Sequence, residues 1–177
     1  MNRRTSLALG TTALLSFAIA LSGTALAQQK SLKEQLVGSW IVVSVDNTAA
    51  DGKKSQIFGP HPKGVLIFSA NGQYSQTIVN PDVPKFKINN RLKGTPEENS
   101  AAVHGTTTSF GTWTVDETSK TITVRNVGGM FPNQAGTDSP RTVTSITADE
   151  LKLSVPLTAS GLRSDNVWKR ATTVANR

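Results

Sequence analysis

Histidine, cysteine and closely paired carboxylates supply most side-chain chemistry, and this chain has few of them. It contains two histidines, His61 and His104, and no cysteine. His61 stands between two prolines in an expected loop, and His104 precedes Gly105 at an expected helix end, where an imidazolium would favour the negative end of the helix dipole. Neither histidine has the spacing of a metal ligand. We therefore assign no catalytic residue, no metal site and no cofactor.

Motifs of the common enzyme classes do not occur in the sequence, which has no Gly-x-Ser-x-Gly, no Walker loop and no dinucleotide fingerprint. Glu97 and Glu98 are adjacent, so on a helix they point in different directions and suit capping better than paired acid and base catalysis. The formal net charge of +7 comes from 19 Lys and Arg against 12 Asp and Glu. Because the cations are spread along the chain, we expect no nucleic acid partner.

Candidate binding residues come from the alternation of aromatic and hydroxyl side chains. In a strand over residues 106–115, Trp113 shares one face with a serine and a threonine, and Phe110 takes the opposite face. Tyr74 lies on another mixed face, together with a glutamine and an isoleucine. Aromatic walls with a few hydroxyls are typical of a small-molecule pocket. The alternative is that these rings fill a closed core.

A glycine-rich segment, residues 128–136, is expected to form a loop that can close over a ligand. Phe131 gives it an apolar surface, and Asn133 and Arg141 give it polar tips, with Arg141 available to contact an anion. Alternatively, these are turn residues and a surface cation paired with Asp138. The candidate ligand-binding residues are therefore Tyr74, Phe110, Trp113, Phe131, Asn133 and Arg141.

The elements that must position these side chains follow from period-two alternation, which predicts short strands. Asn71-Gly72 supplies the backbone angles of a tight hairpin between two of them. Ser31 with Glu34, and Thr95 with Glu98, have capping-box spacing, which predicts a short helix after each cap. The expected strands are Gly38–Val45, Val65–Ser69, Tyr74–Val79, Thr106–Val115, Lys120–Val127, Arg141–Thr147, Leu151–Val155 and Asn166–Arg170, and the helices run to Val37 and His104.

Eight antiparallel strands on one chain of this length can form a sandwich or an up-and-down barrel that has no open edge. Hairpin-length links at several junctions favour the barrel. We therefore predict an all-β fold, an eight-stranded antiparallel up-and-down barrel with a short N-terminal helix and one short helix between the third and fourth strands. Such a barrel has an interior that side chains either fill or line around one small ligand.

Several segments resemble a known family. Leu36-Val37-Gly38-Ser39-Trp40 looks like the Gly-x-Trp opening of lipocalins, and Trp168-Lys169-Arg170 resembles the place where that fold lays a basic side chain over the tryptophan. The resemblance to bacterial and fungal lipocalin-like domain proteins implies a calycin-type barrel, a fold that hosts binders and enzymes alike. Gln134 departs from the family pattern, which often has an aromatic residue there. The further segments that are similar are Phe58–Gly64, Arg91–Glu98, Phe110–Trp113, Phe131–Asn133 and Gly136–Asp138.

Residues 1–27 have the pattern of an export signal. Two arginines give a positive start, a mostly apolar run follows, and Ala25-Leu26-Ala27 supplies small residues before a cleavage site. The apolar run is shorter than the ~20 residues of a membrane-spanning helix, and we expect no membrane span in the mature chain. The expectation is cleavage after Ala27, a periplasmic or secreted protein, and one barrel domain over residues 28–177.

The sequence favours a protein that binds a small apolar or amphipathic ligand in the barrel or at its mouth. Two other function classes stay open. An isomerase or cyclase could use the same pocket, with a His, Tyr or Arg that moves a proton or stabilises charge. A protein-interaction module could use the first strand, which is apolar on both faces through Ile41-Val42-Val43. A filled lumen would favour the interaction module, and converging Tyr, His and Arg in a cavity would favour the enzyme.

Overall fold

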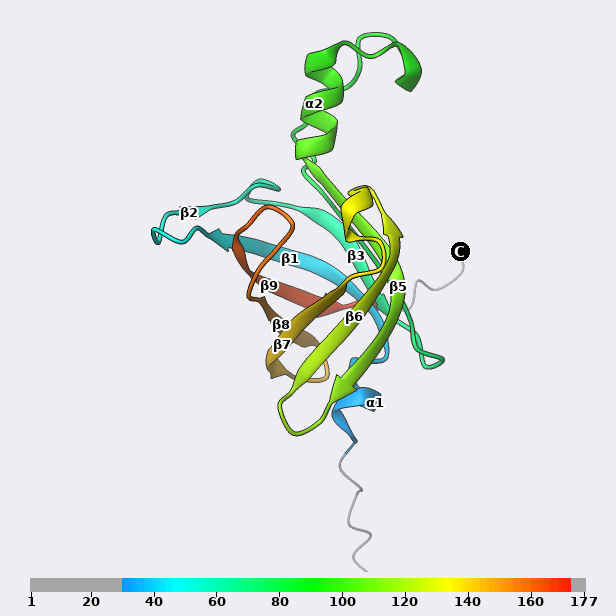
Figure 1. Cartoon of the computed structure of the whole chain (residues 1–177), viewed down its shortest axis with the longest axis vertical. Coiled ribbons are helices and arrows are strands. Elements are labelled where there is room, and N and C mark those ends of the chain that lie inside the picture. The colour runs from blue at the N-terminus through cyan, green and yellow to red at the C-terminus, as the bar shows by residue number, and fades with distance from the viewer. Residues whose placement is uncertain (1–29, 173–177) are drawn as a thin grey trace, which may run out of the picture.

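The computed structural model describes residues 30–172 of the chain, and the expected export signal at residues 1–27 lies outside this range. All eight predicted strands and both predicted helices are present within it, with ends that differ by a few residues (Figure 1). The elements are α1 (Leu32–Leu36), β1 (Gly38–Thr48), β2 (Lys54–Ser55), β3 (Lys63–Phe68), β4 (Gln73–Val79), the 3-10 turn η1 (Arg91–Lys93), α2 (Pro96–His104), β5 (Thr106–Asp116), β6 (Thr121–Gly129), the 3-10 turn η2 (Pro132–Gln134), β7 (Asp138–Ile146), β8 (Glu150–Val155) and β9 (Arg163–Arg170).

The strands form one antiparallel meander that closes on itself. β1 pairs with β3, each later strand pairs with the next, and β9 returns to β1, where Trp40 is opposite Arg170 and Thr48 is opposite Arg163. The two-residue β2 pairs only with the far end of β1, so the other eight of the nine strands make the barrel. The predicted eight-stranded up-and-down barrel is confirmed, and each barrel strand has a partner on both sides.

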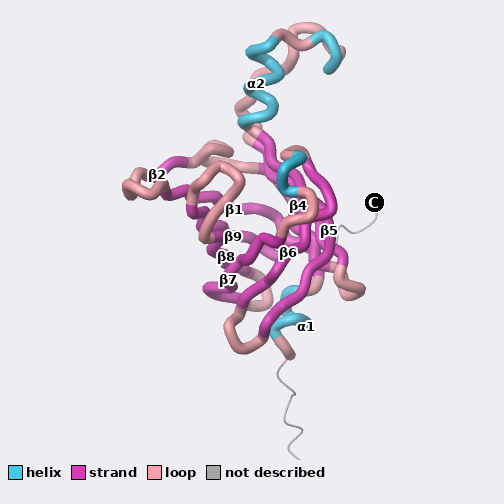
Figure 2. Tube along the Cα trace, viewed as in Figure 1, coloured by secondary structure: helices cyan, strands magenta, loops and turns pink. Residues whose placement is uncertain are grey.

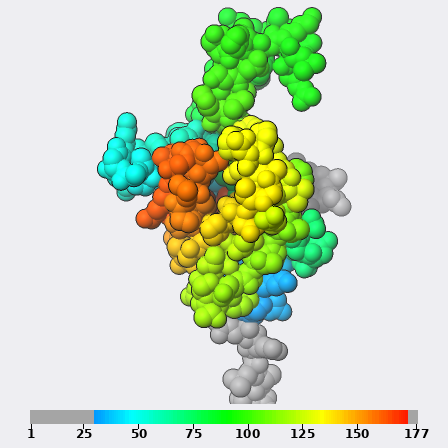
Figure 3. Space-filling view, viewed as in Figure 1, coloured from blue at the N-terminus to red at the C-terminus, as the bar shows by residue number. Residues whose placement is uncertain are grey.

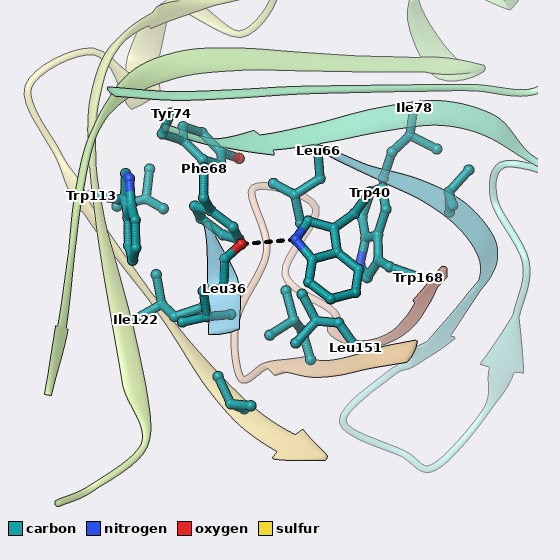
Figure 4. Close-up of a cluster of buried hydrophobic side chains, with 14 of the residues drawn as sticks. Leu36, Trp40, Leu66, Phe68, Tyr74, Ile78, Trp113, Ile122, Leu151 and Trp168 are labelled. Atoms are coloured by element: carbon teal, nitrogen blue, oxygen red, sulfur yellow. Dashed lines mark hydrogen bonds between the residues drawn. The ribbon is translucent and has the colours of Figure 1, made fainter. Parts of the chain in front are cut away.

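The helix α1 closes one end of the barrel, and large apolar side chains fill the lumen next to it. Trp40, Trp168 and Phe68 are fully buried in this cluster (Figure 4). Trp40 Nε1 donates a hydrogen bond of 2.9 Å to the carbonyl oxygen of Leu36, drawn as a dashed line in Figure 4. Because Leu36 ends α1, this bond ties the helix to the first strand.

Gly128 and Gly129 belong to strand β6, so the loop that the sequence predicts over residues 128–136 begins only at residue 130. Both glycines pair with β5, where a side chain on Gly129 would collide with the neighbouring backbone. A Cβ on Gly128 would come within 2.9 Å of the Phe110 ring, which covers this glycine. These glycines therefore allow a close approach of two strands, and the loop at this end of the barrel runs over residues 130–137.

Residues 80–105 leave the barrel between β4 and β5 and project beyond its open end, with α2 as their main element (Figures 1 and 2). Thr95 caps α2 and forms the predicted capping box with Glu98. The Glu98 carboxylate also accepts the backbone N–H of Lys87 at 2.8 Å. These backbone hydrogen bonds from Lys87 and Thr95 hold the pKa of Glu98 below its ordinary value. The segment before α2 is thereby fixed to the helix. At the other end of α2, the backbone N–H of Asn80 donates to the carbonyl oxygen of Gly105 at 2.7 Å, which joins the end of the helix to the residue after β4.

Candidate functional site

The inward-facing side chains change from apolar to polar along the barrel axis. On β6, Ile122 and Val124 are followed by Asn126, and on β9, Trp168 is preceded by Asn166. Because these two strands run in opposite directions, both asparagines lie toward the open end. The lumen is therefore apolar near α1, whereas its other half has buried polar side chains beside apolar ones such as Val45 and Ile78. The further buried polar residues on that half are Asn47, Gln76, Ser109, Arg141 and Ser164.

Arg141 extends from β7 across the lumen to β4. Its Nη1 donates to Gln76 Oε1 at 2.5 Å, and its Nη2 donates to the Tyr74 hydroxyl at 2.6 Å. The guanidinium carbon lies 4.9 Å from the centre of the Tyr74 ring, which is cation–π geometry. Arg141 and Gln76 line the open half of the lumen, whereas Tyr74 is covered beneath them. Arg141 therefore forms a floor between the open half and the apolar core.

The guanidinium of Arg141 is buried without a counter-charge. The residue is 6% exposed, its two bonded partners are neutral, and its Nε has no hydrogen-bond partner within residues 30–172. The described residues that line the cavity include no aspartate or glutamate and no second arginine or lysine. A buried charge without an opposite charge raises the free energy of the folded protein. The floor is therefore a positive site that can accept an anion.

The open half of the lumen is a cavity of about 600 Å³, a size typical of small-molecule sites. Its mouth is surrounded by the loop before β3, the end of α2, the loop at residues 130–137 and the turn between β8 and β9. The last two are the yellow and orange segments on the face seen in Figure 3. Apolar residues at this rim, Ile57, Val103 and Phe131, are partly exposed. The cavity thus combines a polar, charged floor with an apolar rim.

Two of the six candidate residues from the sequence, Arg141 and Phe131, line the cavity. Arg141 was expected at a loop tip, but β7 begins at Asp138, so its side chain lies inside the barrel. Asp138 is not its partner, because this carboxylate pairs with Arg125 at 3.2 Å on the surface. A third candidate, Tyr74, supports the floor through its hydroxyl, which is also 3.2 Å from the hydroxyl of Ser109.

The other three candidates lie away from the cavity. Trp113 is buried in the apolar core, where its Nε1 donates to the carbonyl oxygen of Ser69 at 3.0 Å. Phe110 is 52% exposed on the outer surface of β5, because the alternation of the strand points it away from the lumen. Asn133 is exposed in η2, and the adjacent Gln134 lines the cavity instead.

Sequence reasoning missed the side-chain amides of the cavity wall, Asn47, Asn126 and Asn166. A signal for them exists in the order of residues along each inward row. In strands that run toward the open end the polar residue follows the apolar ones, as Asn126 follows Val124. In strands that run from the open end toward α1, the polar residue comes first, as Asn166 precedes Trp168. This alternation from strand to strand predicts a lumen with one polar end.

Histidines and metal-binding groups contribute little to this site. His104, the last residue of α2, lines the cavity mouth, and His61 is exposed outside it. Across residues 30–172, the structure brings together no group of three His, Cys, Asp or Glu residues that could hold a metal ion.

Over the same range, none of the helices has the length and apolar character to cross a membrane.

An eight-stranded antiparallel barrel, closed by a helix at one end and open to a cavity at the other, is a calycin-type barrel. The chain belongs to the family of lipocalin-like domain proteins, whose family model matches residues 37–177. The resemblance in the sequence motifs is thereby confirmed. A search of curated proteins gives no match to the chain.

The solved structures similar to this chain include designed barrels. A redesigned beta barrel has 16% identity and a TM-score of 0.41, with 81% of this chain and 100% of that chain covered. A de novo designed fluorescence-activating beta barrel has 10% identity and a TM-score of 0.41, with 80% and 99% covered. A redesigned beta barrel bound to DFHBI has 16% identity and a TM-score of 0.40, with 80% and 100% covered.

Proposed function

We propose that the protein binds a small, partly apolar molecule in the open half of its barrel. The observation that supports this most directly is the division of the lumen at Arg141. Apolar side chains fill the half next to α1, whereas the other half is a cavity of about 600 Å³ with a charged floor and an apolar rim. A protein that used its barrel only as a scaffold could fill both halves and gain the stability of a complete core.

The arrangement of polar groups supports binding more than catalysis. Tyr74 is the acid–base side chain nearest the floor, but it is 3% exposed and covered by the Arg141 guanidinium. A general acid or base must reach the proton that it transfers, and Tyr74 does not reach the cavity. His104 lines the mouth, at the rim and away from the buried floor groups. The proposal is therefore a binding protein.

The experiment compares a blocked cavity with an open one. Thr107 lines the cavity from β5, so Thr107→Trp fills part of it, whereas Thr112 is exposed on the outside of the same strand. Native mass spectrometry of protein purified from its own source should show an added small-molecule mass in the wild type and in Thr112→Trp, and none in Thr107→Trp. Equal added mass in both variants would refute the proposal. It would also be refuted if the wild type carried no added mass and bound neither 1-pyrenebutyrate nor 1-pyrenebutanol.

We also propose that the protein acts after export, with residues 1–27 removed. The support is the positive start, apolar run and Ala25-Leu26-Ala27 of the sequence. The intact mass of the protein recovered from the periplasm or medium should correspond to a chain that begins at Gln28. A recovered protein that retains residues 1–27 would refute this proposal.

A further inference from the structure

We propose that the ligand is an organic monocarboxylate that enters head first, with its carboxylate on Arg141 and its apolar part toward the rim. This inference rests on the proposed binding function and adds the chemical class and orientation of the ligand. It is carried by the buried guanidinium, the composition of the cavity wall and the distribution of apolar residues around the mouth.

The charge of the floor selects an anion. Arg141 is 6% exposed, and an arginine side chain stays protonated in proteins. Among residues 30–172 no aspartate or glutamate lines the cavity, and Arg141 takes part in none of the salt bridges. A neutral ligand would take solvent away from this cation and give no charge in return. An anionic ligand supplies the missing counter-charge.

The geometry of the floor favours a carboxylate among anions. A guanidinium presents N–H groups in a planar fork that matches the two oxygens of a carboxylate. Nη1 and Nη2 of Arg141 each donate one N–H to a protein oxygen and keep a second N–H, whereas Nε is buried without a partner in the described part of the chain. Arg141 is also the one arginine or lysine among the described residues of the wall. A single cation matches one negative charge better than the two charges of a phosphate monoester.

The orientation follows from where the apolar side chains lie. The rim carries Ile57, Val103 and Phe131, which are 37%, 54% and 44% exposed. Deeper in the cavity the wall is mixed, with amides and hydroxyls such as Asn166 and Ser109 beside the buried apolar residues Val45, Phe58, Ile78 and Val155, and the charge lies at the floor. An amphipathic acid therefore matches the cavity when its carboxylate is at the floor and its hydrocarbon part covers the exposed rim. The reverse orientation would place the hydrocarbon on the amides and on the charge.

The test uses two fluorescent probes that differ in one group, 1-pyrenebutyrate and the neutral 1-pyrenebutanol. Each is titrated against the full-length mature protein and against Arg141→Lys and Arg141→Met. The wild type should bind the acid about 10- to 100-fold more tightly than the alcohol, the range of a hydrogen bond to a charged group. Arg141→Met should abolish this preference, and Arg141→Lys should keep part of it because the charge remains.

The outcomes separate this inference from the proposed function. If the wild type binds both probes equally and Thr107→Trp binds neither, the cavity is a binding site but the carboxylate inference is wrong. If neither probe binds the wild type, the inference is wrong, and the proposed function is wrong as well if the purified wild type carries no added small-molecule mass. A preference for the acid that persists in Arg141→Met would also overturn the inference, because the carboxylate would then be held elsewhere.

A second measurement distinguishes a binding role for Arg141 from a structural one. Met has a similar length without the charge, so Arg141→Met keeps a side chain across the lumen. If the guanidinium serves the ligand, 1-pyrenebutyrate should raise the thermal unfolding midpoint of the wild type by more than that of Arg141→Met, because a ligand stabilises the fold in proportion to how tightly it binds. An equal rise in both proteins would show that Arg141 mainly holds Gln76 and Tyr74, and would overturn the inference.

Discussion

Arg170 covers the indole of Trp40 at the closed end of the barrel, with its guanidinium carbon 4.0 Å from the ring centre. The same guanidinium donates from Nη2 to the carbonyl oxygen of Gln35 at 2.7 Å and from Nη1 to that of Val37 at 3.2 Å. One side chain on β9 thus fixes the end of α1 and the beginning of β1. The basic residue expected over the tryptophan is present in the structure.

Replacing Trp40 should therefore cost more stability than replacing Arg170. Trp40→Ala removes a fully buried ring and should lower the free energy of unfolding by about 3–5 kcal/mol. Arg170→Met keeps most of the covering chain and loses the hydrogen bonds to partly buried carbonyls, which should cost about 1–3 kcal/mol. Urea unfolding of both variants measures the difference. A wild-type midpoint for Trp40→Ala would show that the ring does not stabilise the barrel.

Phe131 and Phe110 form a matched pair for the position of the binding site. Both are about half exposed, at 44% and 52%, but Phe131 lines the cavity and Phe110 does not. Phe131→Ala should weaken 1-pyrenebutanol by about fivefold, because apolar contact at the rim is lost. Phe110→Ala should leave the affinity unchanged. Fluorescence titration decides, and the opposite pattern would move the site to the outer surface of β5.

Gly111 marks a place where β5 and β6 cannot accept a side chain. A Cβ at this position would collide with the carbonyl oxygen of Arg125 on the neighbouring strand. Gly111→Ala should therefore destabilise the protein by about 3 kcal/mol. The adjacent Thr112 is exposed, and Thr112→Ala should change stability by less than about 0.5 kcal/mol. Equal unfolding midpoints for the two variants in urea would contradict the close approach.

Asp165 should make a small contribution to stability that depends on pH. Burial opposes its ionisation, but hydrogen bonds from Ser154 and Arg163, together with the charge of Arg163, hold the pKa of Asp165 below its ordinary value. This stabilisation is present above the unfolded pKa of about 4 and is lost as the pH falls through the lower folded value.

Asp165→Asn should therefore lose about 0.5 kcal/mol near neutral pH, a small effect because the carboxylate is 41% exposed and screened by solvent. The loss should vanish at an acidic pH below the folded pKa, where the wild-type carboxyl is also protonated. Urea unfolding at the two pH values measures it. An equal loss at both pH values would show that the hydrogen bonds of the Asp165 side chain stabilise the protein and that its charge does not.

The strands and helix caps could be predicted from the sequence because they depend on neighbouring residues. The inward-facing residues of β1 could not, because a bulge in that strand changes which residues face inward. In β1 the pairing with β9 shifts between Val42 and Ser44. Strict alternation from Trp40 would place Ser44 and Asp46 inside the barrel, whereas the structure buries Val45 and Asn47. A bulge depends on the partner strand and is not visible in local alternation.

Arg141 shows a second limit of local patterns. Pro140 precedes it, and a proline ordinarily interrupts a strand because it has no N–H to donate. The predicted strand, Arg141–Thr147, begins just after this proline, and Arg141 is predicted at the edge of the preceding loop. In the structure β7 begins before Pro140, which is exposed on the outer face, and the next residue turns inward. The sequence therefore predicts Arg141 as a site residue, but not its position inside the barrel.

The pairing of β1 with β9 has a consequence for how the chain folds. Val37 and Arg170, which meet at the closed end, are 133 positions apart in the sequence. Contacts between such distant residues form slowly, because a long loop must close before they stabilise anything. During synthesis β1 emerges early and has no β9 to pair with, so its edge and its apolar face are open to other chains. The barrel can close only when the ribosome has released the ninth strand, and a chain stopped before Arg163 would be a substrate for chaperones or aggregation.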